Sequence, residues 1–502
     1  MSTAITPPNW AHSDMAGLPR RDFLQMSNLG MGGLALAHLL QTDGLLADGN
    51  AHTAGPGGAD MRPRHGHFPA QAKSMILLFQ TGGPSQMDLF DPKPELQKRS
   101  GQQHSVQFEF FQPGSQDNTL LGSPFKFSPR GECGMEISDL LPNMAMMADD
   151  LCLIRSMYNE NNNHPPGTQC MNTGKIFPHR PTLGAWISYA LGSENQNLPA
   201  FVVLRDPEGG YPNGGTRLWD NGWLPALFRG TEIQSRGAAV LNLHPSRKTP
   251  ASVQRANLDL LAALNEHRRQ RYPTESDLEA RIRNYELAAR MQENAEQALD
   301  ISGETEATRR LYGIDQPTTE NYGTRCLMAR RMVESGVRFV QVMVPVSGSD
   351  MPWDQHRNLK GGLESICNRV DKPSAGLIRD LKQRGLLDST IVLWTGEFGR
   401  LPISQHGNGR DHNRHAFSLL LAGGGFKPGH TYGATDEFGY SSVDPRVSCP
   451  DLHATLLHQL GLDHTLLYYR HAGREERLTD PEVTGAHVVR DIVGKGHDDS
   501  LV

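Results

Sequence analysis

Short apolar runs rich in β-branched residues alternate along the chain with longer stretches in which apolar residues recur at helical spacing. This alternation predicts an α/β fold in which a mostly parallel central sheet carries helices on both faces. The predicted strands cover residues 75–80, 151–157, 201–204, 338–344, 390–394 and 417–422. The predicted helices cover about 182–191, 322–335, 359–384 and 452–460.

Two segments depart from this alternation. Residues 250–299 are charged, rich in Ala and Leu and free of glycine, which predicts one or two long surface helices. Residues 207–230 are rich in Gly, Trp, Tyr and Pro, and they follow a predicted strand, so they form either a binding loop or a plain surface insertion.

The length of 502 residues exceeds the usual limit for a single core. We therefore expect one large α/β domain with insertions, or one large and one small domain. The large domain is assigned to residues 71–490, with a loop insertion at 205–245, a helical insertion at 250–300 and a tail at 491–502.

The N-terminal region resembles a twin-arginine export signal. Arg20-Arg21 precede a weakly apolar, glycine-rich run at 26–40, which is too short to span a bilayer. We assign residues 1–50 to export and 51–70 to a flexible linker, and we expect a periplasmic or extracellular protein. The alternative is a chance pair of arginines before a core helix. No other run approaches the length of a membrane helix, so no transmembrane anchor is expected.

Charge and cysteine content narrow the range of partners. The chain carries 49 basic and 55 acidic residues, a formal charge of −6, and no long basic run, so nucleic acid is not an expected partner. The six cysteines stand apart without a Cys-x-x-Cys motif, which favours scattered buried thiols over a zinc ribbon or a disulfide scaffold.

Polar side chains, most of them of metal-binding type, gather next to the predicted strands, at the edge where open α/β sheets bind ligands. They are, in chain order, Asp88 with Asp91, His164, Asp354 with His356, Glu397 with Arg400, and Asp411 with His412. Taken singly, each group has an ordinary explanation, because Asp and Asn cap helices and a lone histidine is usually unremarkable. Their recurrence at one edge favours a site for one or two divalent ions such as zinc, manganese or calcium.

Eight of these side chains are assigned candidate roles. The candidate metal ligands are Asp88, Asp354, His356, Glu397 and His412, and the candidate catalytic groups are His164, Arg400 and Asp411. Arg400 is either a bidentate clamp for an anionic oxygen or a partner in an ordinary salt bridge. The sequence contains no HExxH zinc motif, no GxSxG nucleophile elbow, no P-loop and no dinucleotide fingerprint.

At these residues the chain resembles the alkaline-phosphatase/sulfatase superfamily. Over nearly all of the mature chain it resembles an uncharacterised exported bacterial family, a domain of unknown function. The family motifs are Arg20-Arg21, Gly82-Gly83-Pro84-Ser85 with Asp88, Asp91-Pro92-Lys93-Pro94, Trp353-Asp354-x-His356, Gly396-Glu397-Phe398-Gly399-Arg400 and Gly409-Arg410-Asp411-His412. This resemblance implies the fold but no established reaction.

The wider superfamily resemblance implies roles for single positions. The segment 164–175 is similar to the sulfatase nucleophile segment, with His164 at the nucleophile position. The segment 389–399 is similar to a metal-binding strand, with Glu397 in place of an Asp and Phe398 in place of its neighbouring His. The metal-binding Asp of the first strand falls near Thr81, so Asp88 is the substitute candidate.

These departures affect the expected chemistry. Cys170 is out of register with the position where a formylglycine forms, so the resemblance does not imply ordinary sulfatase chemistry. Thr168 and Ser85 are alternative hydroxyl nucleophiles. His164 is expected to point into the ligand crevice as a metal ligand first, with acid, base or nucleophile as alternatives. Glu397 and His356 are expected to share one ligand sphere.

Two functions fit the sequence. The first is a metal-dependent hydrolase of phosphate or sulfate esters, acting on a small molecule or a polysaccharide outside the cytoplasm. The second is a non-catalytic exported protein that serves binding or assembly on the same fold. Loss of the usual nucleophile favours the second function, and retention of several ligand-type residues at strand ends favours the first.

Overall fold

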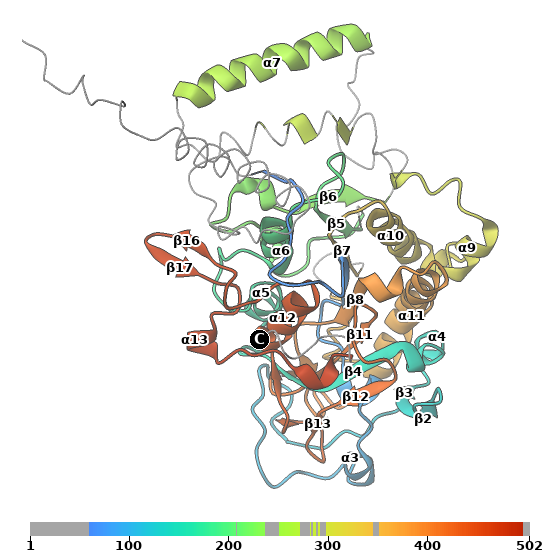
Figure 1. Ribbon diagram of the computed structural model, residues 1–502. Coiled ribbons are helices and arrows are strands. Elements are labelled where there is room, and N and C mark those ends of the chain that lie inside the picture. Colours follow the sequence, from blue (N-terminus) through green and yellow to red (C-terminus); the bar gives the residue numbers. More distant parts are fainter. Residues whose placement is uncertain are drawn as a thin grey trace, which may run out of the picture. The chain divides into compact units, whose positions relative to one another are not determined.

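The computed structural model describes residues 60–206, 208–235, 250–271, 298–344 and 351–494, together with a few positions between 282 and 291 (Figure 1). The chain divides into two units, Met1–Thr53 and Ala54–Val502, and every described residue belongs to the second unit. The expected export segment 1–50 with Arg20-Arg21 lies outside the described residues, as do residues 51–59 of the expected linker and 495–502 of the expected tail.

A nine-stranded sheet forms the centre of the second unit, in the order β12-β4-β11-β8-β1-β7-β5-β6, with β15 also paired to β4. The strands are β1 (Ser74–Phe79), β4 (Leu151–Tyr158), β5 (Phe201–Arg205), β6 (Thr231–Gln234), β7 (Phe339–Met343), β8 (Thr390–Thr395), β11 (Phe417–Ala422), β12 (His430–Tyr432) and β15 (Val447–Ser448). The six predicted strands are confirmed. Their continuous apolar runs are buried in the sheet, as expected for strands covered on both faces.

One strand of this sheet runs against the others. β11 pairs antiparallel with both β4 and β8, whereas the pairs β1–β8, β1–β7, β5–β7 and β5–β6 are parallel. The residues just before β11 therefore lie at the same sheet edge as the carboxyl ends of β4, β7 and β8. This direction places the segment 409–415 beside the residues that follow the parallel strands.

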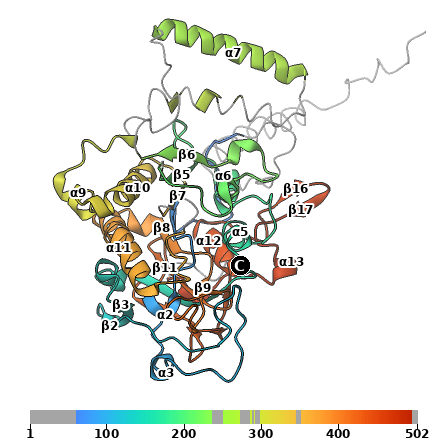
Figure 2. The same ribbon diagram turned by 180° about the vertical axis from the view of Figure 1, so that it is seen from behind.

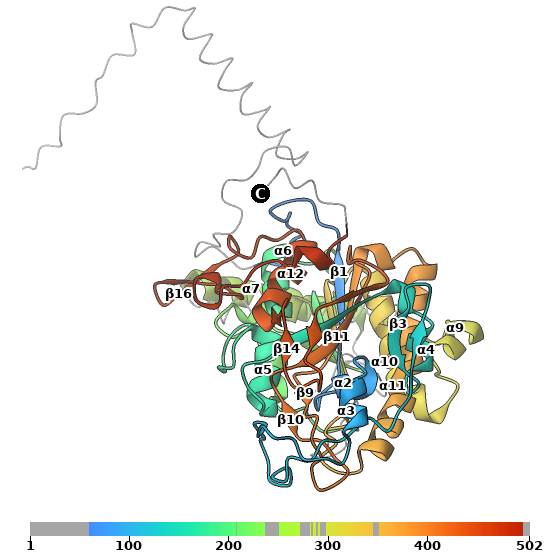
Figure 3. The same cartoon turned by 90° about the horizontal axis from the view of Figure 1, so that it is seen from below.

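Helices cover both faces of the sheet, as the sequence predicts (Figures 1 and 3). On one face lie α5 (His164–Thr173), α6 (Leu183–Leu191) and α12 (Cys449–Gln459), and on the other lie α10 (Pro317–Glu334) and α11 (Leu359–Gln383). Ile76 and Leu78 of β1 belong to the apolar cluster that contains α10 and α11. Leu77 and Phe79 belong to the cluster that contains α6 and α12. The period of two along β1 thus divides its side chains between two cores.

Shorter helices and two-stranded pairs accompany the central sheet and its helices. The remaining helices are α2 (Gln86–Leu89), α3 (Pro94–Lys98), α4 (Pro142–Ala145), α7 (Ala251–Arg271), α9 (Glu306–Leu311) and α13 (Pro481–Thr484). The two-stranded pairs are β2 (Phe127–Arg130) with β3 (Met135–Ser138), β9 (Gly399–Arg400) with β10 (His412–Asn413), β13 (Ala434–Thr435) with β14 (Ser442–Val443), and β16 (Tyr469–His471) with β17 (Arg474–Glu476). The β16–β17 pair lies on the α12 and α13 side of the unit in both views (Figures 1 and 2).

The segment 205–245 contains the strand β6, which pairs with β5, so it is not simply a loop. α7 covers the first part of the expected helical insertion at 250–300. Five cysteines are buried as expected, but Cys133 is exposed. Over the described part of the chain, no helix has the length and apolarity needed to cross a membrane.

Candidate functional site

Asp354 is the carboxylate around which the candidate site is built. It lies in the turn between β7 and α11, and its Oδ1 is 2.9 Å from Nε2 of His356 and 3.1 Å from Nε2 of His412. The same oxygen is 2.6 Å from Nη2 of Arg400. Its Oδ2 is 3.4 Å from Nε2 of His164. Three imidazoles and one guanidinium therefore converge on a single carboxylate.

The fold delivers these side chains from distant parts of the chain. His164 is the first residue of α5, shortly after β4. Arg400 and His412 lie directly opposite each other in the β9–β10 pair, so both side chains reach the same carboxylate. The β9–β10 pair lies near α5 and α2 (Figure 3). The sequence-based expectation that these residues gather at one sheet edge agrees with this placement.

Each imidazole at the site uses its Nδ1 to contact a fixed acceptor. The acceptors are Oε1 of Glu397 for His164 at 2.5 Å, Oε1 of Gln405 for His356 at 2.5 Å, and the carbonyl oxygen of Asn162 for His412 at 2.7 Å. A carboxylate or carbonyl oxygen can only accept, so each Nδ1 carries the hydrogen and donates it. All three Nε2 atoms face Asp354. Among the described residues, Nε2 of His412 is within hydrogen-bond distance of Oδ1 of Asp354, whereas Nε2 of His164 and Nε2 of His356 make no hydrogen bond.

The charges around Asp354 favour its ionised form. Burial alone would raise the pKa of the Asp354 carboxyl, but Arg400 and the surrounding imidazoles hold that pKa well below its usual range. Burial lowers the pKa of His412 to about 3, so this ring stays neutral at neutral pH. Burial would also lower the pKa of His164, but the neighbouring carboxylates of Asp354 and Glu397 raise it instead. The negative charge that holds a proton on His164 would equally attract a cation.

The donor set fits a divalent metal ion. His164, Asp354 and His412 each offer one ligand atom within 4.8 Å of the others, and so do His356, Asp411 and His412. Within the described residues, Nε2 of His164 and Nε2 of His356 are buried and have no hydrogen-bond partner. Three imidazole nitrogens and a carboxylate oxygen suit zinc or manganese better than calcium, which prefers oxygen ligands throughout.

Glu397, an expected ligand, contacts Nδ1 of His164, whereas Asp354 faces Nε2 of the same ring. Both carboxylate oxygens of Glu397 accept from the backbone N–H of Gly82, at 2.9 and 3.1 Å, and Oε1 also accepts from His164. Among the described residues, Glu397 is in neither group of candidate ligands, so the expected ligand sphere shared with His356 is not found. Its contacts orient the His164 ring and hold a hydrogen on Nδ1, which is how outer carboxylates support metal-binding histidines.

Asp88, another expected ligand, is engaged by a different partner. Its two oxygens lie 2.8 and 3.2 Å from Nε and Nη2 of Arg410, and Ser85 donates to Oδ2 at 2.5 Å. Asp88 and Arg410 are both fully buried. Among the described residues, Asp88 is in neither group of candidate ligands. The structure thus corrects this expectation, because a guanidinium already occupies the carboxylate.

Arg400 was expected as a clamp for an anionic oxygen, and the structure uses it otherwise. Nε donates to Gly83 O at 2.9 Å, Nη1 donates to Arg410 O at 3.0 Å, and Nη2 contacts both Gly82 O and Asp354. Its side chain is only 1% exposed. Each of its three nitrogens is engaged by the protein, so Arg400 fixes Asp354 instead of facing a ligand.

Asp411, expected as a catalytic group, binds backbone. Its Oδ2 accepts from the N–H groups of Phe111 and Gln112 at 2.7 Å, and its Oδ1 accepts from the N–H of His412 at 2.8 Å. Oδ1 also lies 3.8 Å from Nδ1 of His356. The ring of Phe111 stacks on that of His412 at 5.1 Å. Asp411 therefore holds the segment around Phe111 over the site.

The alternative hydroxyl nucleophiles are engaged in internal hydrogen bonds. Thr168 Oγ1 lies 2.7 Å from His164 O and 2.9 Å from Asn213 O, and it donates to these carbonyls. Ser85 donates to Asp88. Thr168 and Ser85 are both buried, and so is Cys170 within α5. None of these three side chains is presented as a nucleophile.

Sequence reasoning did not identify three residues of this site, namely Asn162, Gln405 and Phe111. Gln405 lies between the motifs 396–400 and 409–412, and Asn162 lies in the Asn-rich run before His164. This closeness to motifs is the signal in the sequence that points to both residues. Neither side chain is a typical metal ligand, and Phe111 comes from a segment without a motif. Their roles depend on contacts that only folding creates.

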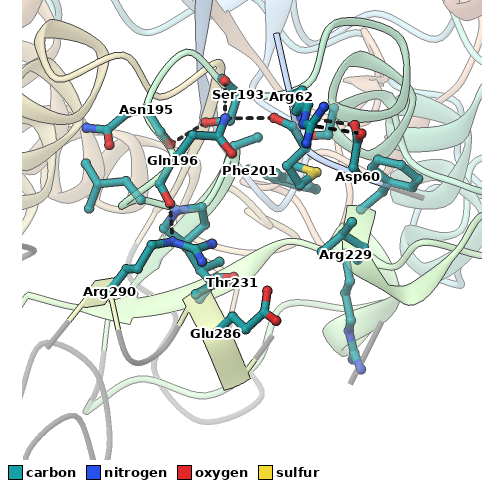
Figure 4. A pocket seen from close by; sticks show the side chains of 18 residues that line it. Asp60, Arg62, Ser193, Asn195, Gln196, Phe201, Arg229, Thr231, Glu286 and Arg290 are labelled. Carbon is teal, nitrogen blue, oxygen red and sulfur yellow. Dashed lines mark hydrogen bonds and ion pairs between the residues drawn. The ribbon is translucent and has the colours of Figure 1, made fainter. Parts of the chain in front are cut away.

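A separate cavity of about 240 Å³ lies at the opposite edge of the sheet, where β5 and β6 begin (Figure 4). Phe201 and Thr231 line it, together with Gln196 and Arg290. Its polar groups bind one another, since Nε of Arg290 donates to Gln196 O at 2.8 Å and Oγ of Ser193 donates to a backbone carbonyl at 2.7 Å. No residue of the candidate site lines this cavity.

Comparison with solved structures finds distant matches. One is a sulfatase from Pseudoalteromonas sp., with 13% identity, a TM-score of 0.33, and coverage of 79% of this chain and 69% of that chain. A phosphonate monoester hydrolase from Silicibacter pomeroyi matches with 13% identity over 70% of this chain and 72% of that chain, at a TM-score of 0.32. An alkaline phosphatase from the Antarctic bacterium TAB5 matches with 12% identity over 70% and 92% of the two chains, at a TM-score of 0.27.

Comparison with curated proteins finds no match. A family model, described as "Protein of unknown function (DUF1501)", matches residues 72–493. The match includes all eight side chains that the sequence singled out as candidate ligands or catalytic groups.

Proposed function

Since the chain belongs to the DUF1501 family of proteins of unknown function, we propose its activity from the site itself: a metal-dependent hydrolase of phosphate or sulfate esters that acts outside the cytoplasm. The observation that carries this proposal is the convergence of three imidazole Nε2 atoms on one carboxylate. Each of these imidazoles has its other nitrogen committed to a fixed acceptor.

This arrangement requires a positive charge at its centre. Nitrogen lone pairs and carboxylate oxygens that face one another at 2.9 to 3.4 Å repel unless a proton or a cation lies among them. His412 stays neutral, because burial lowers its pKa to about 3. Nδ1 of each ring already contacts an outer acceptor, so the Nε2 atoms are the nitrogens left for a cation. A divalent cation relieves this repulsion, with His164, Asp354 and His412 as one group of ligands within 4.8 Å of one another. His356 belongs to the second such group, with Asp411 and His412.

The chain's own residues prepare this site. Arg400 holds Asp354 in place, and Glu397 fixes the tautomer of His164. A bound divalent ion supplies a Lewis acid for the ester oxygen and lowers the pKa of water. Because the hydroxyls of Ser85 and Thr168 are engaged, water is the proposed nucleophile. The resemblance of the segments 164–175 and 389–399 to sulfatase motifs supports a phosphate or sulfate ester as the substrate class.

We predict that His164→Ala lowers metal affinity at least tenfold and lowers turnover in parallel, because a proposed ligand is removed. The measurement combines elemental analysis with assays on aryl phosphate, phosphodiester and aryl sulfate substrates. His453→Ala is a matched control, since His453 is also buried and its Nε2 lies 2.9 Å from Met171 O, outside the candidate site. The control should lose stability and keep its metal.

The outcomes separate the competing functions. Stoichiometric metal with turnover on one member of the panel supports the hydrolase. Stoichiometric metal without turnover on any member favours a binding or assembly protein on the same fold. Wild-type protein that takes up none of the tested divalent ions contradicts the metal centre and, with it, the proposed hydrolase.

Export by the twin-arginine route is a separate proposal. It is supported by Arg20-Arg21 followed by the apolar run at 26–40. Replacing both arginines with lysine should keep the full-length protein in the cytoplasm, because the paired arginines are the recognised feature of the signal. Fractionation of cells that express each form measures the effect. Unchanged export of the double variant would rule out this route.

A further inference from the structure

Gln405 lies in the connection between β9 and β10 and is fully buried. Its Oε1 is 2.5 Å from Nδ1 of His356, and its Nε2 donates to the carbonyl of Pro113 at 2.9 Å. A primary amide has one accepting end and one donating end. Because Pro113 O can only accept, it holds the Nε2 end of the amide and leaves Oε1 to face the imidazole.

The backbone of Gln405 is fixed as firmly as its side chain. Gln405 N donates to Gly409 O at 2.7 Å, and Gly409 N returns a hydrogen bond to Gln405 O at 2.9 Å. Gly409 also packs against the backbone of His356, because a Cβ at Gly409 would lie 2.0 Å from His356 O. The loop therefore holds the Gln405 amide in a fixed position against the His356 imidazole.

This contact selects one tautomer of His356. With Oε1 of Gln405 as acceptor, Nδ1 carries the hydrogen, and Nε2 keeps its lone pair 2.9 Å from Oδ1 of Asp354. Nε2 has no hydrogen-bond partner among the described residues, so this close approach lacks the geometry of a hydrogen bond. The opposite tautomer would place a hydrogen on the nitrogen that faces the other candidate ligands.

The same amide links His356 to the segment 111–113. Pro113 O holds Gln405, the N–H groups of Phe111 and Gln112 hold Asp411, and the Phe111 ring stacks on His412. A single short segment thus supports the surroundings of two candidate ligands.

We propose that Gln405 is a positioning residue of the metal centre: its amide fixes the tautomer and ring orientation of His356 so that Nε2 is available to a divalent cation. This role rests on the proposed metal-dependent function and deepens it. Gln405 does not bind the cation. It acts through the outer nitrogen of His356, as Glu397 does through that of His164.

Two variants separate this role from a merely structural one. Gln405→Leu removes the acceptor, whereas Gln405→Glu keeps an accepting oxygen at the same reach, and both lose the hydrogen bond to Pro113. Zn²⁺ and Mn²⁺ dissociation constants are measured on metal-stripped full-length protein by competition with a chromophoric chelator. We expect Gln405→Leu to weaken the binding of these ions about 10- to 100-fold. Gln405→Glu should bind these ions with an affinity within about threefold of the wild-type value, or more tightly, because the glutamate keeps an acceptor for Nδ1 of His356.

Gln459→Leu provides the matched control, since Gln459 is a fully buried glutamine on α12 outside the site. Thermal unfolding of each metal-free variant measures stability separately. A purely structural role would lower the unfolding temperature of both Gln405 variants and leave the dissociation constants of both unchanged.

The tautomer of His356 can also be measured in the wild-type protein. This measurement tests the proposal even if Gln405→Leu fails to fold. In histidine-labelled, metal-free protein, imidazole ¹⁵N shifts assigned with His356→Gln should show the Nδ1–H form of His356. The Nε2–H form would overturn the proposal. Wild-type affinity in Gln405→Leu would also overturn it and leave the metal centre intact, as would equal weakening in the Leu and Glu variants. A wild-type chain that binds neither ion contradicts the proposed function itself.

Discussion

Replacing Asp354 with asparagine is expected to reduce metal affinity more than any single histidine substitution at the site. Asparagine keeps the size and one oxygen but removes the negative charge that faces all three imidazoles. Loss of a unit charge in direct contact with a divalent ion should weaken binding on the order of 100-fold or more. Metal stoichiometry and a competition titration on purified full-length protein measure this loss.

Asp380→Asn serves as the control for this prediction. Asp380 is also a buried aspartate in contact with an arginine, since its Oδ2 lies 3.0 Å from Nε of Arg330. It lies on α11, away from the candidate site. Both variants leave a buried guanidinium with a weaker partner, so both should lose stability. Only Asp354→Asn should lose metal, and equal metal content in the two variants would show that the histidine cluster is not the binding site.

Replacing Asp88 with alanine is expected to lower the free energy of unfolding by about 3–5 kcal/mol and to leave the metal content of the folded protein unchanged. Asp88 and Arg410 are both fully buried and share two contacts, at 2.8 and 3.2 Å. Without its partner, the Arg410 charge stays buried and uncompensated, which is far more costly than loss of an exposed pair. Denaturant unfolding followed by circular dichroism measures the change.

A double variant tests the reason for this loss. Asp88→Leu combined with Arg410→Met removes both charges and replaces them with apolar side chains of similar size. It should recover a large part of the stability that either single change removes, because no uncompensated charge remains. If Asp88→Ala instead removes the metal and leaves stability intact, Asp88 is a ligand, as the sequence suggested.

The sequence by itself determined the framework and the place of the site. Continuous apolar runs of strand length specified β1, β4, β5, β7, β8 and β11, because strands buried on both faces need apolar side chains on both. Ligands bind at the carboxyl edge of such sheets, so polar residues next to the strands marked the site in advance. This reasoning identified Asp354 and the three histidines whose Nε2 atoms meet at its carboxylate, His164, His356 and His412.

Only the tertiary structure decided how the remaining residues are used. Asp88 and Glu397 have the same chemistry as ligands, but Asp88 meets Arg410, 322 positions away, and Glu397 meets the outer nitrogen of His164. The antiparallel direction of β11 brings the segment 409–415 to this edge. A side chain's role depends on which atoms surround its donors and acceptors, and these neighbours come from strands and loops far apart in the chain. Local pattern therefore specified which residues gather, and long-range packing divided them into candidate ligands, their supports and a buried ion pair.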